Sequence, residues 1–158
     1  MRFRVSLMIN IRQKGAGGER EIADQLNFIV YRQMQLFGLP PINNSIQRNQ
    51  NQTAVGGSDL TGTMGLSIEV KRQETLSINT WWVQTTESAE RSNETPVLIY
   101  RQSRKPWCVV MNIDIPLFTH EGQHAHMRVR GTFDWDSFKL FFEEHVKRKL
   151  RAGYIPTI

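Results

Sequence analysis

The segment from Leu66 to Lys71 alternates apolar and polar side chains and carries β-branched residues at Ile68 and Val70. This alternation predicts a β-strand, because successive side chains of a strand point to opposite faces. Ile68 and Val70 are then expected in a core. Glu69 and Lys71 share the other face. The chain must therefore build a sheet that buries one face of this strand while presenting an acid and a base together on the other.

A second carboxylate precedes this strand. Asp59 lies just before the turn Gly62-Thr63-Met64-Gly65, so residues 58–71 are predicted to form a hairpin that folds Asp59 back toward Glu69. Two carboxylates and one ammonium fit phosphodiester hydrolysis, because carboxylate oxygens hold Mg²⁺ or Mn²⁺ and a lysine offsets charge on the reacting phosphate. The alternative is a solvent-exposed Glu/Lys pair on an edge strand.

Hydrophobic periodicity predicts three helices around this hairpin. Apolar residues recur at three- and four-residue steps from Glu19 to Phe37, where Gly38 and Pro40 end the helix. A second helix is predicted over residues 79–92, with Asn79 or Thr80 as its cap, and a final one after Asp134. Two short apolar runs within residues 97–111 predict another hairpin. The expected fold class is α/β: a small mixed central β-sheet flanked by helices, with an added C-terminal helix.

Composition places these elements in one basic domain. The 158 residues suit a single domain over 1–158, and 20 basic against 15 acidic side chains give a net charge of +5. Residues 51–100 reverse this balance, with three basic and six acidic side chains. The basic surplus favours a polyanionic partner. The acidic middle third indicates either a cation-binding stretch or chance variation.

Several classes of function are disfavoured by what the sequence lacks. No apolar run approaches the roughly 20 residues of a membrane span, and the N-terminus does not have the pattern of a signal peptide. Cys108 is the only cysteine, which suits a reducing compartment, and a small hydrophobic role for it is favoured over a nucleophilic one. There is no phosphate-binding G-x-x-x-x-G-K-[ST] loop. We therefore expect a cytoplasmic protein with no membrane partner and no nucleotide cofactor.

Three motifs together resemble a known nuclease superfamily. They are Lys14-Gly15-Ala16-x-x-Glu19-Arg20-Glu21, Gly57-Ser58-Asp59-Leu60 and Ile68-Glu69-Val70-Lys71. The set resembles the PD-(D/E)XK nucleases, and is most similar to the archaeal-type Holliday junction resolvases, which also occur in some viruses. Ser58 replaces the proline of the superfamily's name. The resemblance implies a restriction-endonuclease-like core over about residues 14–112, with residues 1–13 and 114–158 as N- and C-terminal extensions.

The resemblance also implies roles for individual residues. Glu19 is the helix-borne carboxylate, and with Asp59 and Glu69 it forms the expected set for Mg²⁺, with Mn²⁺ as a substitute. Lys71 is the expected catalytic lysine. Gln84 follows in the next helix, where related nucleases often carry a polar residue that faces the site, and a glutamine can orient a water. The alternative for Glu19 is a residue that stabilises the first turn of its helix.

The function implied is a metal-dependent, structure-selective DNA endonuclease that resolves four-way junctions as a homodimer, because paired incisions suit a two-fold dimer. The alternatives are a general or restriction/repair-type nuclease of the same superfamily and a non-catalytic DNA-binding module. Gly15, Gly17 and Gly18 before the first helix are candidates to cradle a phosphate. Arg20 has a second interpretation, as an ion-pair partner of Asp24. The side chains expected to contact DNA are Lys14, Arg20, Arg48, Arg72, Arg101, Arg104 and Lys105.

Two further groups have open interpretations. Trp81 and Trp82 are interpreted as core or dimer-face anchors, with base stacking as the alternative. His120, His124 and His126 are interpreted as part of a polar hairpin or a DNA-facing surface, with a zinc site as the alternative, because no cysteine lies nearby and Glu121 is the only further ligand in the stretch.

Overall fold

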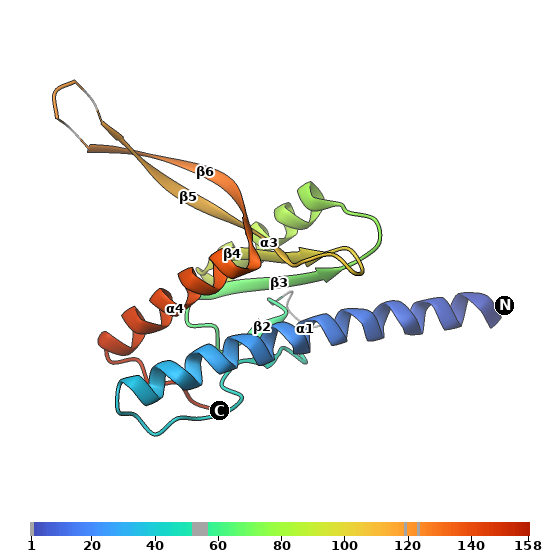
Figure 1. The fold of residues 1–158 in the computed structure, drawn as a ribbon. Helices are drawn as coiled ribbons and strands as arrows, with labels where there is room; N and C mark the ends of the chain where they lie inside the picture. The colour runs from blue at the N-terminus through green and yellow to red at the C-terminus, as the bar shows by residue number, and fades with distance from the viewer. Residues whose placement is uncertain (1, 52–56, 119, 123) are drawn as a thin grey trace.

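The computed structural model describes residues 2–51, 57–118, 120–122 and 124–158; for residues 2–12 and 124 it describes the backbone alone. Helices and strands alternate along the chain (Figure 1). In order they are α1 (Arg2–Leu36), β1 (Gln47–Arg48), β2 (Leu60–Thr61), β3 (Leu66–Arg72), α3 (Ile78–Ser92), β4 (Thr95–Arg101), β5 (Cys108–Phe118), β6 (His124–Asp134) and α4 (Trp135–Arg151).

The central sheet has four strands in the order β3-β4-β5-β6. β3 and β4 are parallel and joined by α3, whereas β4, β5 and β6 are antiparallel neighbours. α1 and α4 cover one face of this sheet and α3 covers the other. The predicted fold class, a small mixed sheet flanked by helices with an added C-terminal helix, is confirmed.

Two hydrophobic clusters hold the layers together. The larger lies between the sheet and the α1–α4 pair, and it buries Ile68 and Val70 of β3 as their alternation predicted. The smaller packs Trp81 of α3 on Leu98, Tyr100 and Val110. Trp81 is therefore a core residue. Because β3 is an edge strand, burying its apolar face against α1 leaves its opposite face available to polar side chains.

The first helix is longer than the sequence indicated. We expected it to begin at Glu19, but α1 runs without a break from Arg2, so most of the expected N-terminal extension is its first turns. The glycine run lies inside the helix. A Cβ atom on Gly18 would lie 3.2 Å from the Trp107 ring and 3.6 Å from Cβ of Arg72. Gly18 thus serves close helix–sheet packing, at a cost of about 1 kcal/mol of helix propensity. The predicted phosphate-cradling glycine loop is wrong.

The predicted hairpin over residues 58–71 is also wrong in its pairing. Thr61 and Leu60 pair with Gln47 and Arg48 of β1 in a separate two-stranded sheet, and not with β3. Gly62 ends β2 at a positive φ of 76°, where a Cβ atom would lie 2.0 Å from a backbone carbonyl oxygen. The chain therefore turns sharply toward β3 after β2.

The remaining elements largely follow the sequence. α1 ends before Gly38, which has a positive φ, and β4 and β5 form the second predicted hairpin. Asp134 caps α4 by accepting a hydrogen bond from the backbone N–H of Ser137. α3 begins after Ser77, not at a cap of Asn79 or Thr80.

The C-terminal extension contains a strand that we did not predict, β6, which pairs with β5 along its full length. No helix in the described part of the chain combines the length and the apolarity that a bilayer crossing requires.

Candidate active site

Asp59 is fixed by three hydrogen bonds, two to the outer edge of β3 and one to Asn49. Its backbone N–H donates to the carbonyl oxygen of Ile68 (2.9 Å), and its carbonyl oxygen accepts from the N–H of Asn49 (2.8 Å). Its side-chain Oδ2 accepts from the backbone N–H of Val70 (2.7 Å). The side chain is therefore directed along the strand toward Glu69, although no β-ladder joins the two segments.

Glu69 and Lys71 lie beside Asp59 on the face of β3 opposite Ile68 and Val70. The Lys71 Nζ atom is 3.8 Å from Glu69 Oε2, and the two side chains are only 25% and 12% exposed. This pair is thus partly withdrawn from water, unlike an ion pair on an exposed edge strand. A charge in such a place interacts more strongly with its neighbours than one in bulk solvent.

Glu19 reaches the same place from α1. It is almost fully buried, and its Oε2 atom lies 2.5 Å from Nε of Arg48 on β1. The sequence placed Glu19 on the core side of its helix, one turn before Ile22, and its burial agrees with that placement. Arg48, predicted to contact DNA, is held on Glu19 in this arrangement.

The carboxylates act on one another electrostatically. Burial raises the pKa of Glu69 to about 8, with the negative charge of Asp59 adding to the rise and Lys71 opposing it. Burial likewise raises the pKa of Glu19, against the hydrogen bond from Arg48, and Asp59 raises it further. Lys71 also acts on Glu19. Glu19, Asp59, Glu69 and Lys71 therefore form one coupled cluster.

Glu69→Gln is expected to stabilise the protein above pH 8 by roughly 3–5 kcal/mol, measured by urea denaturation in the presence of EDTA. Folding raises the pKa of Glu69 from its ordinary value of 4.5 to about 8. The stability that the protonated carboxyl contributes is therefore fully present below pH 4.5 and is lost as the pH rises through about 8. Glutamine does not ionise and escapes this loss. At pH 5 the variant and the wild type are expected to agree, and Glu87→Gln, at an exposed position of α3, serves as control. Equal stabilities at pH 9 would contradict the burial of a charged Glu69.

The cluster has the donor chemistry of a divalent metal site. Asp59 and Glu69 supply hard oxygen ligands, and their mutual repulsion in a buried place is what a cation relieves. In the present arrangement no three His, Cys, Asp or Glu groups among the described side chains are placed to hold a metal ion. Arg48 instead neutralises the third carboxylate, Glu19.

Gln84 is exposed on α3. The inner side of α3, with Trp81, Thr85, Ser88 and Ala89, is buried. The role of Gln84 beside Glu69 and Lys71 stays a prediction.

Arg101, predicted to contact DNA, has an intramolecular role in the structure. Its two terminal nitrogen atoms donate to the carboxylate of Glu21 at 3.2 and 2.8 Å, and its guanidinium lies 4.3 Å from the centroid of the Trp107 ring. The indole N–H of Trp107 donates to the same carboxylate (2.9 Å). These contacts join α1 to the β4–β5 hairpin.

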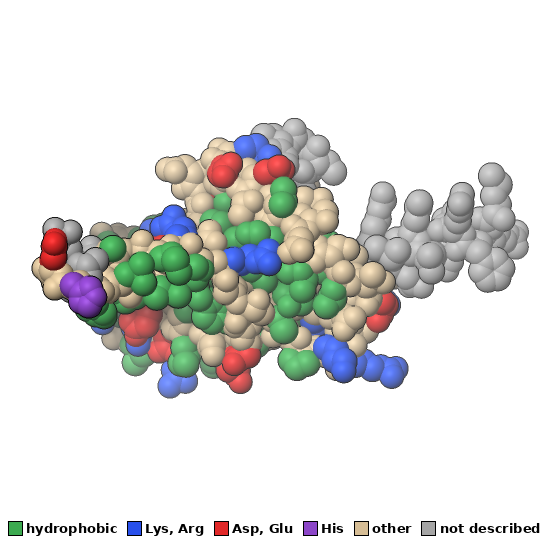
Figure 2. All heavy atoms as spheres, turned by 90° about the horizontal axis from the view of Figure 1, so that it is seen from above, with side chains coloured by type: hydrophobic (Ala, Val, Ile, Leu, Met, Phe, Trp, Pro, Cys, Tyr) green, Lys and Arg blue, Asp and Glu red, His purple; other side chains and the backbone are tan. Residues whose placement is uncertain are grey.

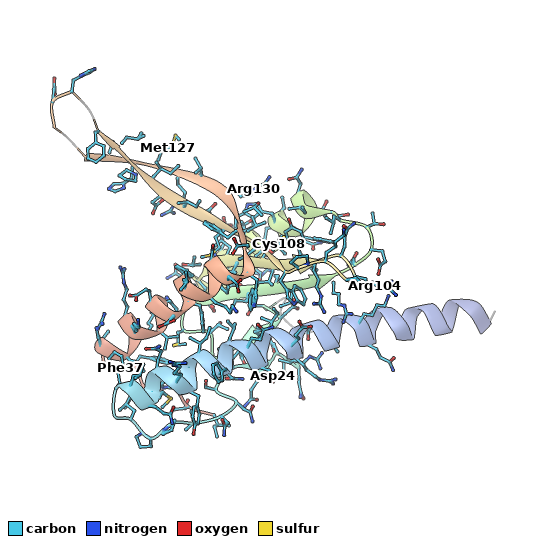
Figure 3. All side chains as sticks on the ribbon, in the orientation of Figure 1. Asp24, Phe37, Arg104, Cys108, Met127 and Arg130 are labelled. Carbon is cyan, nitrogen blue, oxygen red and sulfur yellow. The ribbon has the colours of Figure 1, made fainter. Side chains whose placement is uncertain are left out.

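The other predicted DNA contacts lie at one end of the sheet or along α1. Arg104 and Lys105 are exposed at the tip of the β4–β5 turn, where Figure 3 labels Arg104. Arg20 is exposed on α1, whereas Arg72 is half-buried under the glycine run. Lys14 lies 3.6 Å from the Glu74 carboxylate in an exposed pair.

Two residues that support the site were missed from the sequence. Asn49 holds the segment before Asp59 by donating from its side-chain amide to the carbonyl oxygen of Ser58 (2.9 Å). Glu21 anchors Arg101 and Trp107. Nothing in the local sequence marks Asn49, which lies in a run rich in Asn and Gln, whereas Glu21 was visible as part of the motif that begins at Lys14.

Comparisons with known proteins identify the family to which this chain belongs. Among solved structures, the chain is similar to Hjc of Archaeoglobus fulgidus, described as a Holliday junction resolvase from an archaeal hyperthermophile, with 14% sequence identity and a TM-score of 0.40. That match covers 80% of this chain and 88% of that chain. A search of curated proteins found no match. The family model described as "Phage putative PDDEXK endonuclease" matches residues 10–148. The chain therefore belongs to this family of phage PD-(D/E)XK endonucleases.

Proposed function

We propose that the protein is a metal-dependent DNA endonuclease whose active site is the cluster of Glu19, Asp59, Glu69 and Lys71. The observation that carries this is the meeting of Asp59, Glu69 and Lys71 at the free edge of β3, in a partly buried place where the acids act on each other. Bound there, Mg²⁺ or Mn²⁺ supplies charge neutralisation of a phosphate and a more acidic water.

The protein's own groups then have separate tasks. Asp59 and Glu69 would hold the cation, with Glu19, which pairs with Arg48 in the structure, as the third carboxylate. Lys71 offsets negative charge that develops on the reacting phosphate. Gln84, from the flank of α3, orients the attacking water without adding charge.

We further propose a four-way DNA junction as the substrate and a homodimer as the active form. Support comes from the resemblance of the motif from Lys14 to Glu21 to that of archaeal-type resolvases, together with the basic surplus of the chain. A two-fold dimer presents two sites at a fixed spacing, which suits paired incisions in opposed strands.

Cleavage of a synthetic four-way junction, measured against linear duplex, single strand and flap in Mg²⁺, tests this proposal. Cutting of the junction by paired incisions, with little cutting of duplex, is the expected result. Comparable cutting of the duplex would leave a general nuclease. Binding of the junction without cutting, in Mg²⁺ and in Mn²⁺, would leave a non-catalytic DNA-binding module.

Replacing both Arg104 and Lys105 by alanine is expected to lower the salt slope of log K for DNA binding by about 1.8, since each lost phosphate contact removes about 0.9. The binding series runs from low to moderate salt, and cleavage at saturating protein should change little. Arg101→Ala is the matched comparison: its guanidinium is held by Glu21, so it should leave the slope unchanged while lowering stability. An unchanged slope in the double variant would mean that this turn does not contact DNA, and the basic end of α4 would become the better candidate.

A further inference from the structure

β5 and β6 extend well beyond the rest of the sheet as a two-stranded arm, made of residues 112–118 and 124–130 (Figure 1). β4 pairs with β5 only as far as Val110, so past that point β5 and β6 have only each other among the described strands. Isolated two-stranded hairpins are at best marginally stable in water. The arm therefore needs a further surface to pack against.

The two faces of the arm differ in chemistry. On one face Arg128 and Asp114 form an exposed ion pair (2.8 Å). The other face, here called the arm face, continues the buried side of β5 and consists of apolar residues placed opposite each other in the register: Ile113, Ile115, Leu117, Met127 and Val129. Ile115, Leu117 and Met127 are 39–47% exposed. This alternation is that of an antiparallel sheet with one covered and one solvated face.

The molecule is apolar at a second place, on the outer side of the two packed helices. A groove of about 810 Å³ runs between α1 and α4. Phe28, Leu36 and Leu140 line it and are 66%, 69% and 68% exposed. Asp24, labelled on α1 in Figure 3, lies on its rim. Figure 2 shows hydrophobic side chains gathered beside the tip of the arm as well.

Neither surface suits DNA. From residue 112 to 130 the two acidic residues, Asp114 and Glu121, are balanced by two basic ones, Arg128 and Arg130, with histidines neutral, so the arm carries no net positive charge. The groove is lined by three acidic and two basic side chains. A polyanion needs a basic surface, and the chain as a whole carries its positive surplus elsewhere. The partner that covers the arm face is therefore a protein.

We propose that this partner is a second copy of the chain: the arm face of each copy packs into the α1–α4 groove of the other across a two-fold axis. Such an exchange covers both apolar surfaces at once and closes without leaving either exposed. The six exposed side chains named above present roughly 600–700 Å² per chain, close to the roughly 800 Å² per partner of a stable interface. The inference gives the homodimer of the proposed function its contact surfaces, and it is tested without DNA.

Sedimentation of the full chain, with a matched pair of variants, tests the arm. Met127→Lys places an ammonium on the arm face, and His126→Lys places the same group on the next residue of β6, which points the other way. The wild type is expected to be a dimer at micromolar concentration. Met127→Lys should weaken dimerisation at least a hundredfold, and His126→Lys by less than about threefold. A monomeric wild type, or equal effects of the two variants, would overturn the proposal.

Cross-linking tests the groove. In a Cys108→Ser background, chains carrying Met127→Cys are mixed with chains carrying Leu140→Cys and treated with a short bis-maleimide. Cross-linked dimers are expected in the mixture and not with either variant alone. Dimers from Met127→Cys alone would mean that arms pair with arms, and no cross-link in the mixture would mean that arm and groove do not meet; either overturns the proposal.

Failure of the arm exchange can be told apart from failure of the proposed nuclease function. Lys71→Ala, which lies far in the sequence from both surfaces, should dimerise like the wild type although cleavage is lost. A monomer that still cuts DNA in Mg²⁺ would overturn the arm exchange and leave the nuclease assignment standing. A dimer that forms the expected cross-link but never cuts DNA would support the arm exchange and overturn the nuclease assignment.

Discussion

Lys71→Ala is expected to lower the single-turnover rate of DNA cleavage about a thousandfold at saturating Mg²⁺. Removing one preorganised group that stabilises charge at a reacting centre commonly costs about 10²–10³ in rate. Lys71 is placed for a large effect because its ammonium is 25% exposed and lies 3.8 Å from Glu69. In such a place its charge is less screened than at the surface.

Metal binding separates this role from that of a ligand. An ammonium has no lone pair to offer a cation, so Mn²⁺ titration of Lys71→Ala should still show binding. Arg128→Ala, which removes an equal charge from an exposed pair with Asp114 on the solvated face of the arm, should cut DNA at the wild-type rate. If Lys71→Ala also cut normally, Glu69 and Lys71 would be no more than an ion pair on an edge strand.

Local sequence was sufficient for the strand that carries the site. The alternation from Leu66 to Lys71 fixes which side chains enter the core, since a slip of one residue would bury Glu69 and expose Ile68. Two short apolar runs within residues 97–111 predicted the second hairpin. The end of α1 followed from Gly38, and the cap of α4 from Asp134.

The parts that local sequence did not predict depend on distant partners. From the local sequence Gly18 is expected to break the helix. In the structure the Trp107 ring, far along the chain, occupies the space that a side chain at position 18 would fill. Asp59 reaches Glu69 by a hydrogen bond from a strand backbone and not by hairpin pairing. Arg48 finds Glu19, and Arg101 finds Glu21, through tertiary packing that no spacing rule encodes.

The arm illustrates the same limit. β6 has alternating polarity, but its apolar positions are short of β-branched residues and are interrupted by Gly131. At that glycine, a Cβ atom would lie 2.4 Å from the side chain of Ile113 on the paired strand. The residue is therefore explained by its cross-strand neighbour, which only the register reveals.

Asp59→Asn is expected to abolish cleavage while leaving the fold and DNA binding intact. The asparagine retains an amide oxygen that can accept the N–H of Val70, so the segment stays fixed against β3. It loses the negative charge that the cation needs, and Mn²⁺ binding should weaken accordingly. DNA should bind as well as before or more tightly, because one charge that repels the phosphate is gone.

Comparison with Asp59→Ala separates the effect of the Asp59 charge from the effect of its hydrogen bond to Val70. Alanine removes the acceptor as well, which leaves the buried N–H of Val70 without this partner and should cost about 1–3 kcal/mol of folding stability. The asparagine variant should show little of that loss in urea denaturation, yet both variants should be inactive in cleavage of labelled junction DNA. Wild-type cleavage by Asp59→Asn would remove Asp59 from the metal set. Since Asp59 is held to β3 by its backbone as well as by its side chain, the proposed metal ligands would then be Glu19 and Glu69 alone, with Asp59 serving only to tie its segment to the edge of the sheet.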